Sequence, residues 1–200
     1  KTPFALGAVM ALAAVLPSQT TDQDHLRDNV LAQLKWRELG PVQSGGRIVD
    51  IAVHPTRPQV FWLASASGGI WHTTNNGVSF TPQFQTAESI SIGDICVSSS
   101  DPNVLYVGTG EANNQRSSYW GNGVHKSTDG GQTWQHMGLD GTDHIGRIVI
   151  HPEDPNIAYV AALGALYSSN DQRGLYKTTD GGESWQRIHN VNPDTGFVDV

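Results

Sequence analysis

From residue 46 onward, short apolar runs alternate with turn-forming residues. Runs that begin at a glycine occur at 46–54, 93–97 and 146–151, and each is followed by a turn containing Pro and then by a second apolar run. A third run comes next, again beginning at a glycine, as in GVHK at 123–126. Short β-forming runs bounded by such residues are typical of strands in antiparallel sheets.

Each third run ends in a similar stretch, which we call the repeated turns: TTNNGVSF (73–80), STDGGQTW (127–134) and TTDGGESW (178–185). Gly accepts positive φ, and an Asp or Asn side chain can accept hydrogen bonds from its own turn. We therefore predict hairpin turns before a fourth strand, with structural rather than catalytic or metal-binding acids. The first copy, with Asn and Phe in place of Asp and Trp, is expected to be looser. The predicted structural residues are Asn75, Asp129, Gly131, Trp134, Asp180, Gly182 and Trp185.

The unit repeats roughly every 50 residues, which is typical of a propeller blade. We predict an all-β fold, a β-propeller of four-stranded antiparallel blades, over residues 36–200. The expected blades are 46–86, 92–139 and 145–191, with the start of a fourth at 196. Because propellers have about 4–8 blades, the ring is incomplete, and we expect the remaining blades to be missing from this chain.

The first 35 residues follow a different pattern. Residues 4–16 are apolar throughout, but a membrane-spanning helix needs about 20 such residues. We interpret residues 1–20 as a truncated signal peptide; a hydrophobic anchor or an N-terminal helix is the alternative. Residues 21–35 have apolar residues at helical spacing, which predicts a short helical leader. We expect a secreted or periplasmic protein with no membrane span in the mature chain.

Composition limits the partners. The formal net charge is −7, which disfavours nucleic acid and anionic membrane surfaces. The single cysteine, Cys96, excludes an internal disulfide within this sequence. The histidines lack metal-ligand spacing, so we predict no metal and no cofactor.

The repeated turns resemble the Asp box (BNR repeat) of sialidases, the sortilin N-terminal propeller family and related bacterial β-propellers. The motifs WRELGP (36–41), GGR (45–47), SGGIW (67–71) and GTGE (108–111) are similar to the sortilin-type subgroup of exported bacterial BNR-repeat propellers. The resemblance implies a glycosyl hydrolase-like β-propeller whose Asp boxes lie on the face away from the ligand site. It does not specify the activity, because propellers host many functions.

We expect ligand contacts at the opposite, loop-rich end of the blades, where the long loops 111–122 and 165–173 lie. Aromatic rings there can stack on a sugar ring or a peptide side chain, and amides can add hydrogen bonds. The candidate ligand-binding residues of these loops are Asn113, Asn114, Arg116, Tyr119, Trp120 and Tyr167.

Three charged residues are further candidates. Glu111 is a candidate general acid or base, or alternatively a residue that holds loop backbone N–H groups. Arg47 and Arg147 are candidate ligand-binding residues that can clamp a carboxylate, as the arginine cluster of sialidases does. Alternatively, they pair with Asp94 as lining of the central channel. The Arg-Ile-Pro form of sialidases is absent, because valine follows Arg-Ile in both places.

A second enzymatic alternative resembles the xyloglucan-active endoglucanase propellers. In that family an Asp lies two residues before a Gly-Gly pair of blade 1, whereas this chain has Ala66 before Gly68 and Gly69, so that mechanism would lack its base. Our main prediction is an exported propeller that binds carbohydrate or peptide on its loop-rich face. The alternative is a glycoside hydrolase, sialidase-like or endoglucanase-like, whose full active site lies partly outside this sequence.

Overall fold

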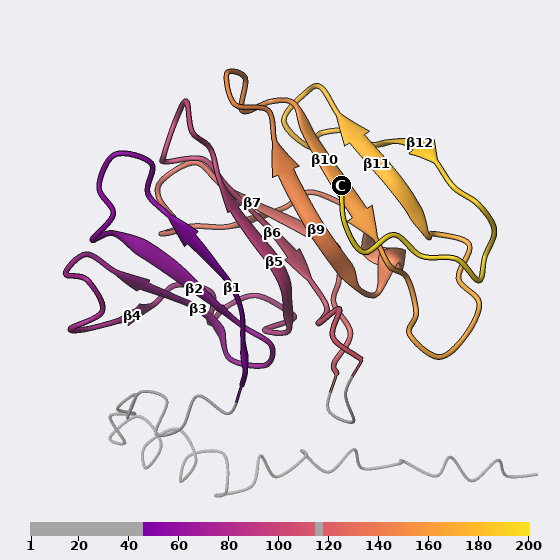
Figure 1. Ribbon diagram of the computed structural model, residues 1–200, viewed down its shortest axis with the longest axis horizontal. Helices are drawn as coiled ribbons and strands as arrows, with labels where there is room; N and C mark the ends of the chain where they lie inside the picture. Colours follow the sequence, from indigo (N-terminus) through magenta and orange to yellow (C-terminus); the bar gives the residue numbers. More distant parts are fainter. Residues whose placement is uncertain (1–45, 115–117) are drawn as a thin grey trace, which may run out of the picture. The chain divides into compact units, whose positions relative to one another are not determined.

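The computed structural model describes residues 46–114 and 118–200. The expected signal peptide, helical leader and Arg116 lie outside these residues. The strands form three four-stranded antiparallel sheets, each with its strands in chain order (Figure 1). The first sheet holds β1 (Ile48–Val53), β2 (Phe61–Ser65), β3 (Gly69–Thr73) and β4 (Thr81–Pro82). The second holds β5 (Ile92–Val97), β6 (Leu105–Thr109), β7 (Val124–Ser127) and β8 (Gln135–His136). The third holds β9 (Ile145–Ile150), β10 (Ala158–Ala162), β11 (Gly174–Thr178) and β12 (Gln186–His189).

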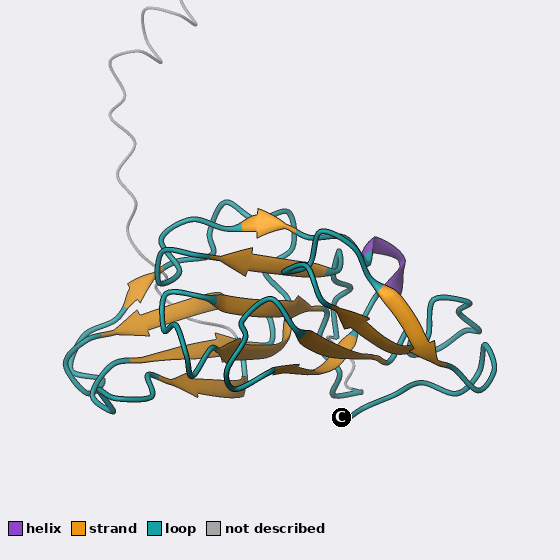
Figure 2. Ribbon diagram, turned by 90° about the horizontal axis from the view of Figure 1, so that it is seen from above, coloured by secondary structure: helices purple, strands orange, loops and turns teal. Residues whose placement is uncertain are grey.

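The described residues contain no α-helix, and one turn of 3-10 helix, η1 (Asp140–Thr142), precedes the third sheet. The predicted all-β fold of four-stranded antiparallel blades is confirmed. The sheets pack against one another through their faces, with the first strands β1, β5 and β9 side by side (Figures 1 and 2).

Two apolar cores lie between neighbouring sheets. In β6 all five residues are buried, and successive side chains point to opposite faces. Leu105 and Val107 join the core shared with the first sheet, which includes Trp62 and Phe84. Tyr106 joins the core shared with the third sheet. A strand covered on both faces therefore reads as a continuous apolar run.

The repeated turns are held by their own side chains. Thr178 Oγ1 donates to Asp180 Oδ1 at 2.7 Å and accepts from Gly182 N at 2.9 Å. Ser184 N donates to Asp180 Oδ1 at 3.0 Å. Hydrogen bonds from the Ser184 side chain and backbone, and from Thr178, hold the pKa of Asp180 well below its usual range. Gly182 has φ 96°, which a side chain would strain.

The first copy is not looser in its hydrogen bonding, so that expectation is wrong. Asn75 Oδ1 accepts from Ser79 N at 3.0 Å, as the Asp carboxylates accept in the other copies. Asn75 Nδ2 also donates to Ser79 Oγ at 2.9 Å. An amide oxygen replaces the carboxylate oxygen as acceptor, and the amide nitrogen adds a donor.

The closing tryptophans connect each turn to the preceding sheet. Trp134 Nε1 donates to the carbonyl of Gln83 at 2.9 Å, and Trp185 Nε1 donates to the carbonyl of Met137 at 2.7 Å. In the first copy Phe80 instead meets the ring of Phe61 edge-on, at 6.0 Å between centroids. The tryptophans therefore link neighbouring sheets as well as closing their own turns.

Candidate functional site

The loops between second and third strands lie at the end of the sheets opposite the repeated turns. The links from one sheet to the next emerge at the same end, because the strands of each sheet run up and down in chain order. The aromatic side chains predicted to contact a ligand are on this end. Tyr119, Trp120 and Tyr167 are 60%, 75% and 73% exposed.

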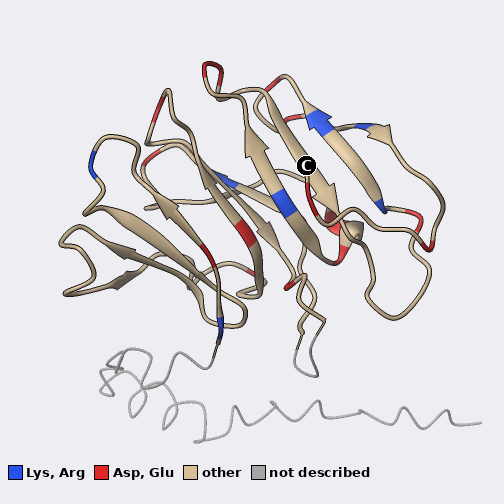
Figure 3. Cartoon of the chain, viewed as in Figure 1, with Lys and Arg blue, Asp and Glu red and all other residues tan. Residues whose placement is uncertain are grey.

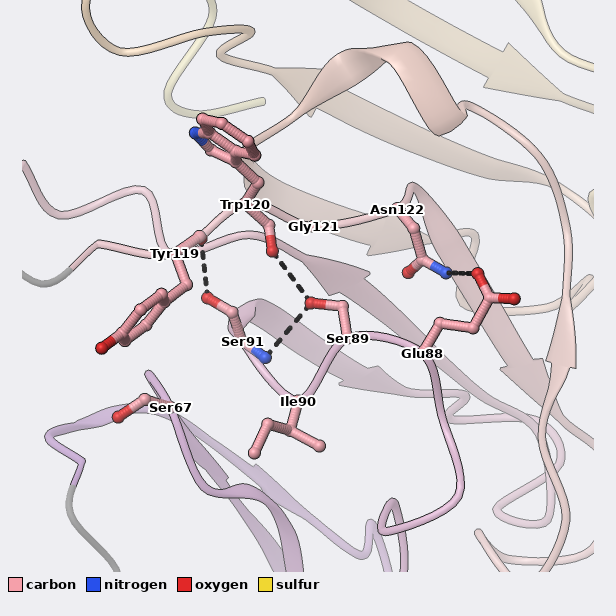
Figure 4. A pocket seen from close by; sticks show the side chains of 9 residues that line it. All are labelled: Ser67, Glu88, Ser89, Ile90, Ser91, Tyr119, Trp120, Gly121 and Asn122. Atoms are coloured by element: carbon pink, nitrogen blue, oxygen red, sulfur yellow. Dashed lines mark hydrogen bonds between the residues drawn. The ribbon is translucent and has the colours of Figure 1, made fainter.

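A first cavity of about 670 Å³ opens at this end between the first and second sheets (Figure 4). Its size is within the range of about 300–1,000 Å³ that is usual for ligand pockets. It combines two exposed aromatic residues with hydroxyl, amide and carboxylate groups. The lining residues are Ser67, Glu88, Ser89, Ile90, Ser91, Tyr119, Trp120, Gly121 and Asn122.

Two serines fix the aromatic part of the loop. Ser89 Oγ donates to the carbonyl of Trp120, and Ser91 Oγ donates to the carbonyl of Tyr119, both at 2.9 Å. Figure 4 shows the two rings leaving the loop in different directions, Tyr119 toward the side of Ser67 and Trp120 away from it. The backbone is anchored while the rings stay exposed, so the loop offers flat surfaces without having to order first.

The carboxylate of Glu111 faces protein rather than solvent. Its residue is 0% exposed, and its Oε1 accepts from Arg47 Nε at 3.0 Å and from Arg47 Nη2. Its Oε2 is buried and has no hydrogen-bond partner, and its N–H donates to Ser91 Oγ at 3.1 Å. In this arrangement Glu111 connects the start of the first sheet to the backbone that carries the loop.

The glycines before Glu111 allow the second and third sheets to approach closely. A Cβ at Gly108 would lie 2.4 Å from the Cγ2 of Ile145, and one at Gly110 would lie 1.9 Å from the carbonyl oxygen of Asp143. Gly110 also has φ 84°. The GTGE motif is therefore a close-packing requirement next to the site.

Arg147 is not part of the first cavity. The strand register places Asp50, Asp94 and Arg147 at equivalent positions of β1, β5 and β9, with a β-bulge near each acid. Each acid accepts a backbone N–H from the next sheet, Ile95 N to Asp50 Oδ2 at 3.4 Å and Ile148 N to Asp94 Oδ2 at 2.7 Å. The equivalent positions of the three first strands therefore carry an acid in β1, an acid in β5 and an arginine in β9 (Figure 3).

Arg147 lies between two carboxylates, with Nη1 3.7 Å from Asp94 Oδ1 and Nε 3.9 Å from Asp199 Oδ1. Burial, with a smaller contribution from the neighbouring Asp50, raises the pKa of Asp94 to about 7, against the lowering effects of the Ile148 N–H and Arg147. The two candidate arginines thus have different carboxylate partners, Glu111 for Arg47 and Asp94 with Asp199 for Arg147.

A hydrogen bond from the hydroxyl of Tyr167 to Asn114 Oδ1 connects the two long loops. Arg173 stabilises the loop that carries Tyr167. It is buried and donates hydrogen bonds to the carbonyls of Leu163 at 2.6 Å and Ser168 at 2.9 Å. The remaining amide candidate, Asn113, accepts at its carbonyl from Ser118 Oγ.

Sequence reasoning missed Ser67, Glu88, Ser89 and Ser91. Ser67 begins the SGGIW motif but was not predicted to contact a ligand, and no motif marks the other three, since serines and glutamates are common on surfaces. The available signal was topological, because residues 88–91 directly precede the first strand of the second sheet, at the end where the long loops emerge.

Within the described ranges no group of three or more His, Cys, Asp or Glu side chains is arranged to hold a metal ion. Two histidines stabilise turns by accepting hydrogen bonds from the backbone. His151 Nδ1 accepts from Asp154 N and His54 Nδ1 accepts from Thr56 N, both at 3.2 Å. No helix among residues 46–114 and 118–200 is long and apolar enough to cross a bilayer.

No family model matches the sequence. The chain is 27% identical over 179 residues to the xyloglucanase Xgh74A of Acetivibrio thermocellus, an alignment that covers 82% of this chain and 20% of that protein. It is 30% identical over 145 residues to an oligoxyloglucan-reducing end-specific xyloglucanase of Emericella nidulans, covering 70% of this chain and 16% of that protein. The fold matches the crystal structure of an ancestral GH74 enzyme with a TM-score of 0.62 at 22% identity, covering 82% of this chain and 21% of that one.

The fold and these similarities define the class: the described sheets are blades of a glycoside hydrolase-like β-propeller. The chain spans about one fifth of the length of the first of these curated relatives and less of the second.

Proposed function

We propose that the protein is a glycoside hydrolase-like propeller and that the first cavity binds part of a carbohydrate substrate. The observation that carries the proposal is the cavity itself, in which Tyr119 and Trp120 are exposed on a loop whose backbone is fixed by Ser89 and Ser91. Aromatic faces next to hydroxyl, amide and carboxylate groups suit a sugar ring, which has apolar faces and a polar rim. The sequence similarity to two xyloglucanases supports a carbohydrate over a peptide.

We infer that the acid and base for hydrolysis come from residues outside the described blades. Ser67 lines the cavity and is preceded by Ala66, the position where the xyloglucan-active resemblance leads us to expect an Asp. Glu111 is buried against Arg47, which disfavours direct contact with a substrate. Inverting hydrolysis requires two carboxyl groups about 6.5–9.5 Å apart. The first cavity itself offers only the carboxylate of Glu88 among its described lining residues.

A sialidase-like site is less well supported than one for a neutral glycan. No Lys or Arg is among the described residues that line the cavity, and Arg47 and Arg147 already have carboxylate partners. An anionic sugar would meet Glu88 without a compensating cation.

We also infer that the repeated turns are Asp boxes of a sortilin-type exported propeller. The shared hydrogen bonds of the three turns and the apolar segment 4–16 support this inference. Fractionation of producing cells tests the export, since we expect the protein outside the cytoplasm. Recovery in the cytoplasmic fraction alone would contradict it.

The function is tested with the whole protein on a panel of xyloglucan, unbranched β-glucans, sialosides and peptides. Binding and release of new reducing ends are measured separately. We expect binding to neutral glucans, weakened by Trp120→Ala. Retention of peptides alone would replace this proposal with the sortilin-like binding alternative.

A further inference from the structure

A second cavity adjoins the first, with which it shares lining residues. It has a volume of about 390 Å³ and lies between the link from β4 to β5 and the outer strands β7 and β8. Its lining residues are Phe84, Thr86, Ala87, Glu88, Asn122, His125, Trp134, His136 and Asp140. Glu88 and Asn122 also line the first cavity, so the two cavities share a wall.

The two residues that line both cavities are hydrogen-bonded to each other. Asn122 Nδ2 donates to Glu88 Oε2 at 3.3 Å, at the edge of the first cavity (Figure 4). Glu88 is exposed, whereas the backbone of Asn122 is fixed because its N–H donates to Thr109 Oγ1 at 2.7 Å. A long, exposed hydrogen bond is weak and is readily exchanged for a bond to a ligand hydroxyl.

The second cavity has a prearranged set of polar groups. His136 Nε2 lies 2.6 Å from the carbonyl of Asn122 and 3.2 Å from Asp140 Oδ1. The Asp140 side chain is 74% exposed, so its carboxylate retains acceptor capacity toward solvent.

An aromatic surface accompanies these groups. The indole of Trp134 is half-buried and is held by two hydrogen bonds from its Nε1, to the carbonyls of Gln83 and Gly131. It is also packed edge-to-face on Phe84, with 5.2 Å between ring centroids. A ring fixed in this way provides a contact surface at little cost in conformational entropy.

Charge selects the kind of ligand. The described lining of the two cavities contains the carboxylates of Glu88 and Asp140, the imidazoles of His125 and His136 in the second cavity, and no Lys or Arg. Carboxylates accept hydrogen bonds from hydroxyl groups, whereas they repel a uronate, a sialate or a phosphate.

From these contacts we propose that the second cavity is a further subsite for a neutral sugar unit. A neutral oligosaccharide would lie across the Glu88–Asn122 contact with at least one ring in each cavity. The inference rests on the proposed carbohydrate function and adds the length and charge of the ligand. Residues of the second cavity then determine how much a longer chain gains over a shorter one.

The test is calorimetric titration of the whole protein with neutral β-1,4-glucan oligosaccharides of increasing length and with uronate-containing counterparts of equal length. We expect affinity to rise with length until both cavities are filled, and the uronate series to bind more weakly. Asp140→Ala removes a carboxylate acceptor, and Thr86→Trp fills the second cavity from an exposed position. Each is expected to reduce the advantage of the long chain over the shortest binder by about fivefold.

Glu153→Ala is the matched control, because it removes one exposed acid from the turn between β9 and β10, at the opposite end of the sheets. It should leave the length dependence unchanged. If the subsite variants lower the affinity for oligosaccharides of all lengths equally, or for none of them, the proposed second subsite is overturned while carbohydrate binding stands. If no oligosaccharide of any length binds, both proposals are overturned together.

Discussion

Arg47 and Glu111 join two sheets across a sequence separation of 64 residues, with Arg47 Nε donating to Glu111 Oε1 at 3.0 Å. Arg47 directly precedes β1, and Glu111 follows β6 by two residues. The Glu111 side chain is 0% exposed, whereas that of Arg47 is 44% exposed. The contact is therefore an ion pair that clamps two sheets together, with its carboxylate buried and its guanidinium partly exposed to solvent.

Glu111→Gln distinguishes a clamp from a general acid or base. Because Gln keeps an acceptor for Arg47 but loses the charge, we expect the free energy of unfolding to fall by about 1–2 kcal/mol. We expect any hydrolytic activity to fall no more than the folded fraction. Urea unfolding and initial rates on a glucan substrate measure the two effects. If fully folded variant protein instead turned over its substrate about 100-fold more slowly, Glu111 would be assigned to the chemistry, since a factor of that order is typical for a lost acid or base.

Trp120→Ala is expected to weaken carbohydrate binding by about two- to tenfold, because one stacking surface is worth about 0.5–1.5 kcal/mol. The residue is 75% exposed, so the melting temperature should change little. Titration and calorimetry of the same preparation check both. Val78→Ala, which removes an 84% exposed side chain from the first repeated turn, is the control that should leave binding unaltered.

In the second repeated turn, we expect Asp129→Ala and Asp129→Asn to differ in their effect on the stability of the folded protein. Asp129 Oδ1 accepts from Thr133 N at 2.9 Å, and the equivalent Asn75 accepts from Ser79 N at 3.0 Å. Asn thus preserves the backbone bond, while Ala leaves it unmade at a cost of about 1 kcal/mol. We expect a lower melting temperature for Ala than for Asn, with glycan binding unchanged in both. Equal melting temperatures would contradict this account of the turn.

Asp94 should make stability depend on pH. Its pKa is raised to about 7 in the folded protein, above the value of about 3.9 in an unfolded chain. The folded state therefore holds the proton more tightly, and the free energy of unfolding contributed by this group falls as the pH rises from about 4 to 7. Above pH 7 the contribution levels off.

Asp94→Asn keeps an acceptor for the N–H of Ile148 and cannot ionise. We expect it to gain stability relative to the unaltered protein by roughly 1–3 kcal/mol between pH 4 and pH 7. Urea midpoints measured across this range check the sign. A difference that is constant with pH would contradict the pKa shift.

Local chemistry made the strands and turns predictable. The TTDGGESW stretch forms its turn through its own Thr178, Asp180 and Ser184, so eight consecutive residues contain the information. Similarly, the continuous apolar run of β6 follows from its burial on both faces.

The candidate sites could not be predicted in full, because they depend on which residues of distant segments lie side by side. The sequence alone does not show this. The first cavity combines residues from three separate segments, around Ser67, Glu88 and Tyr119. A β-bulge between Ile48 and Asp50 makes Asp50 the counterpart of Asp94. Arg47, which the sequence analysis grouped with Arg147 as a residue that can clamp a carboxylate, lies three residues before Asp50 and pairs with Glu111.

The tryptophan contacts between sheets also have a direction. Trp134 reaches back to the sheet before it, and Trp185 does the same one blade later. Each closing tryptophan thus connects its own blade to the blade before it, as expected for repeats coupled to their nearest neighbours. The stability of a described blade would therefore depend in part on the blade that follows it in the sequence.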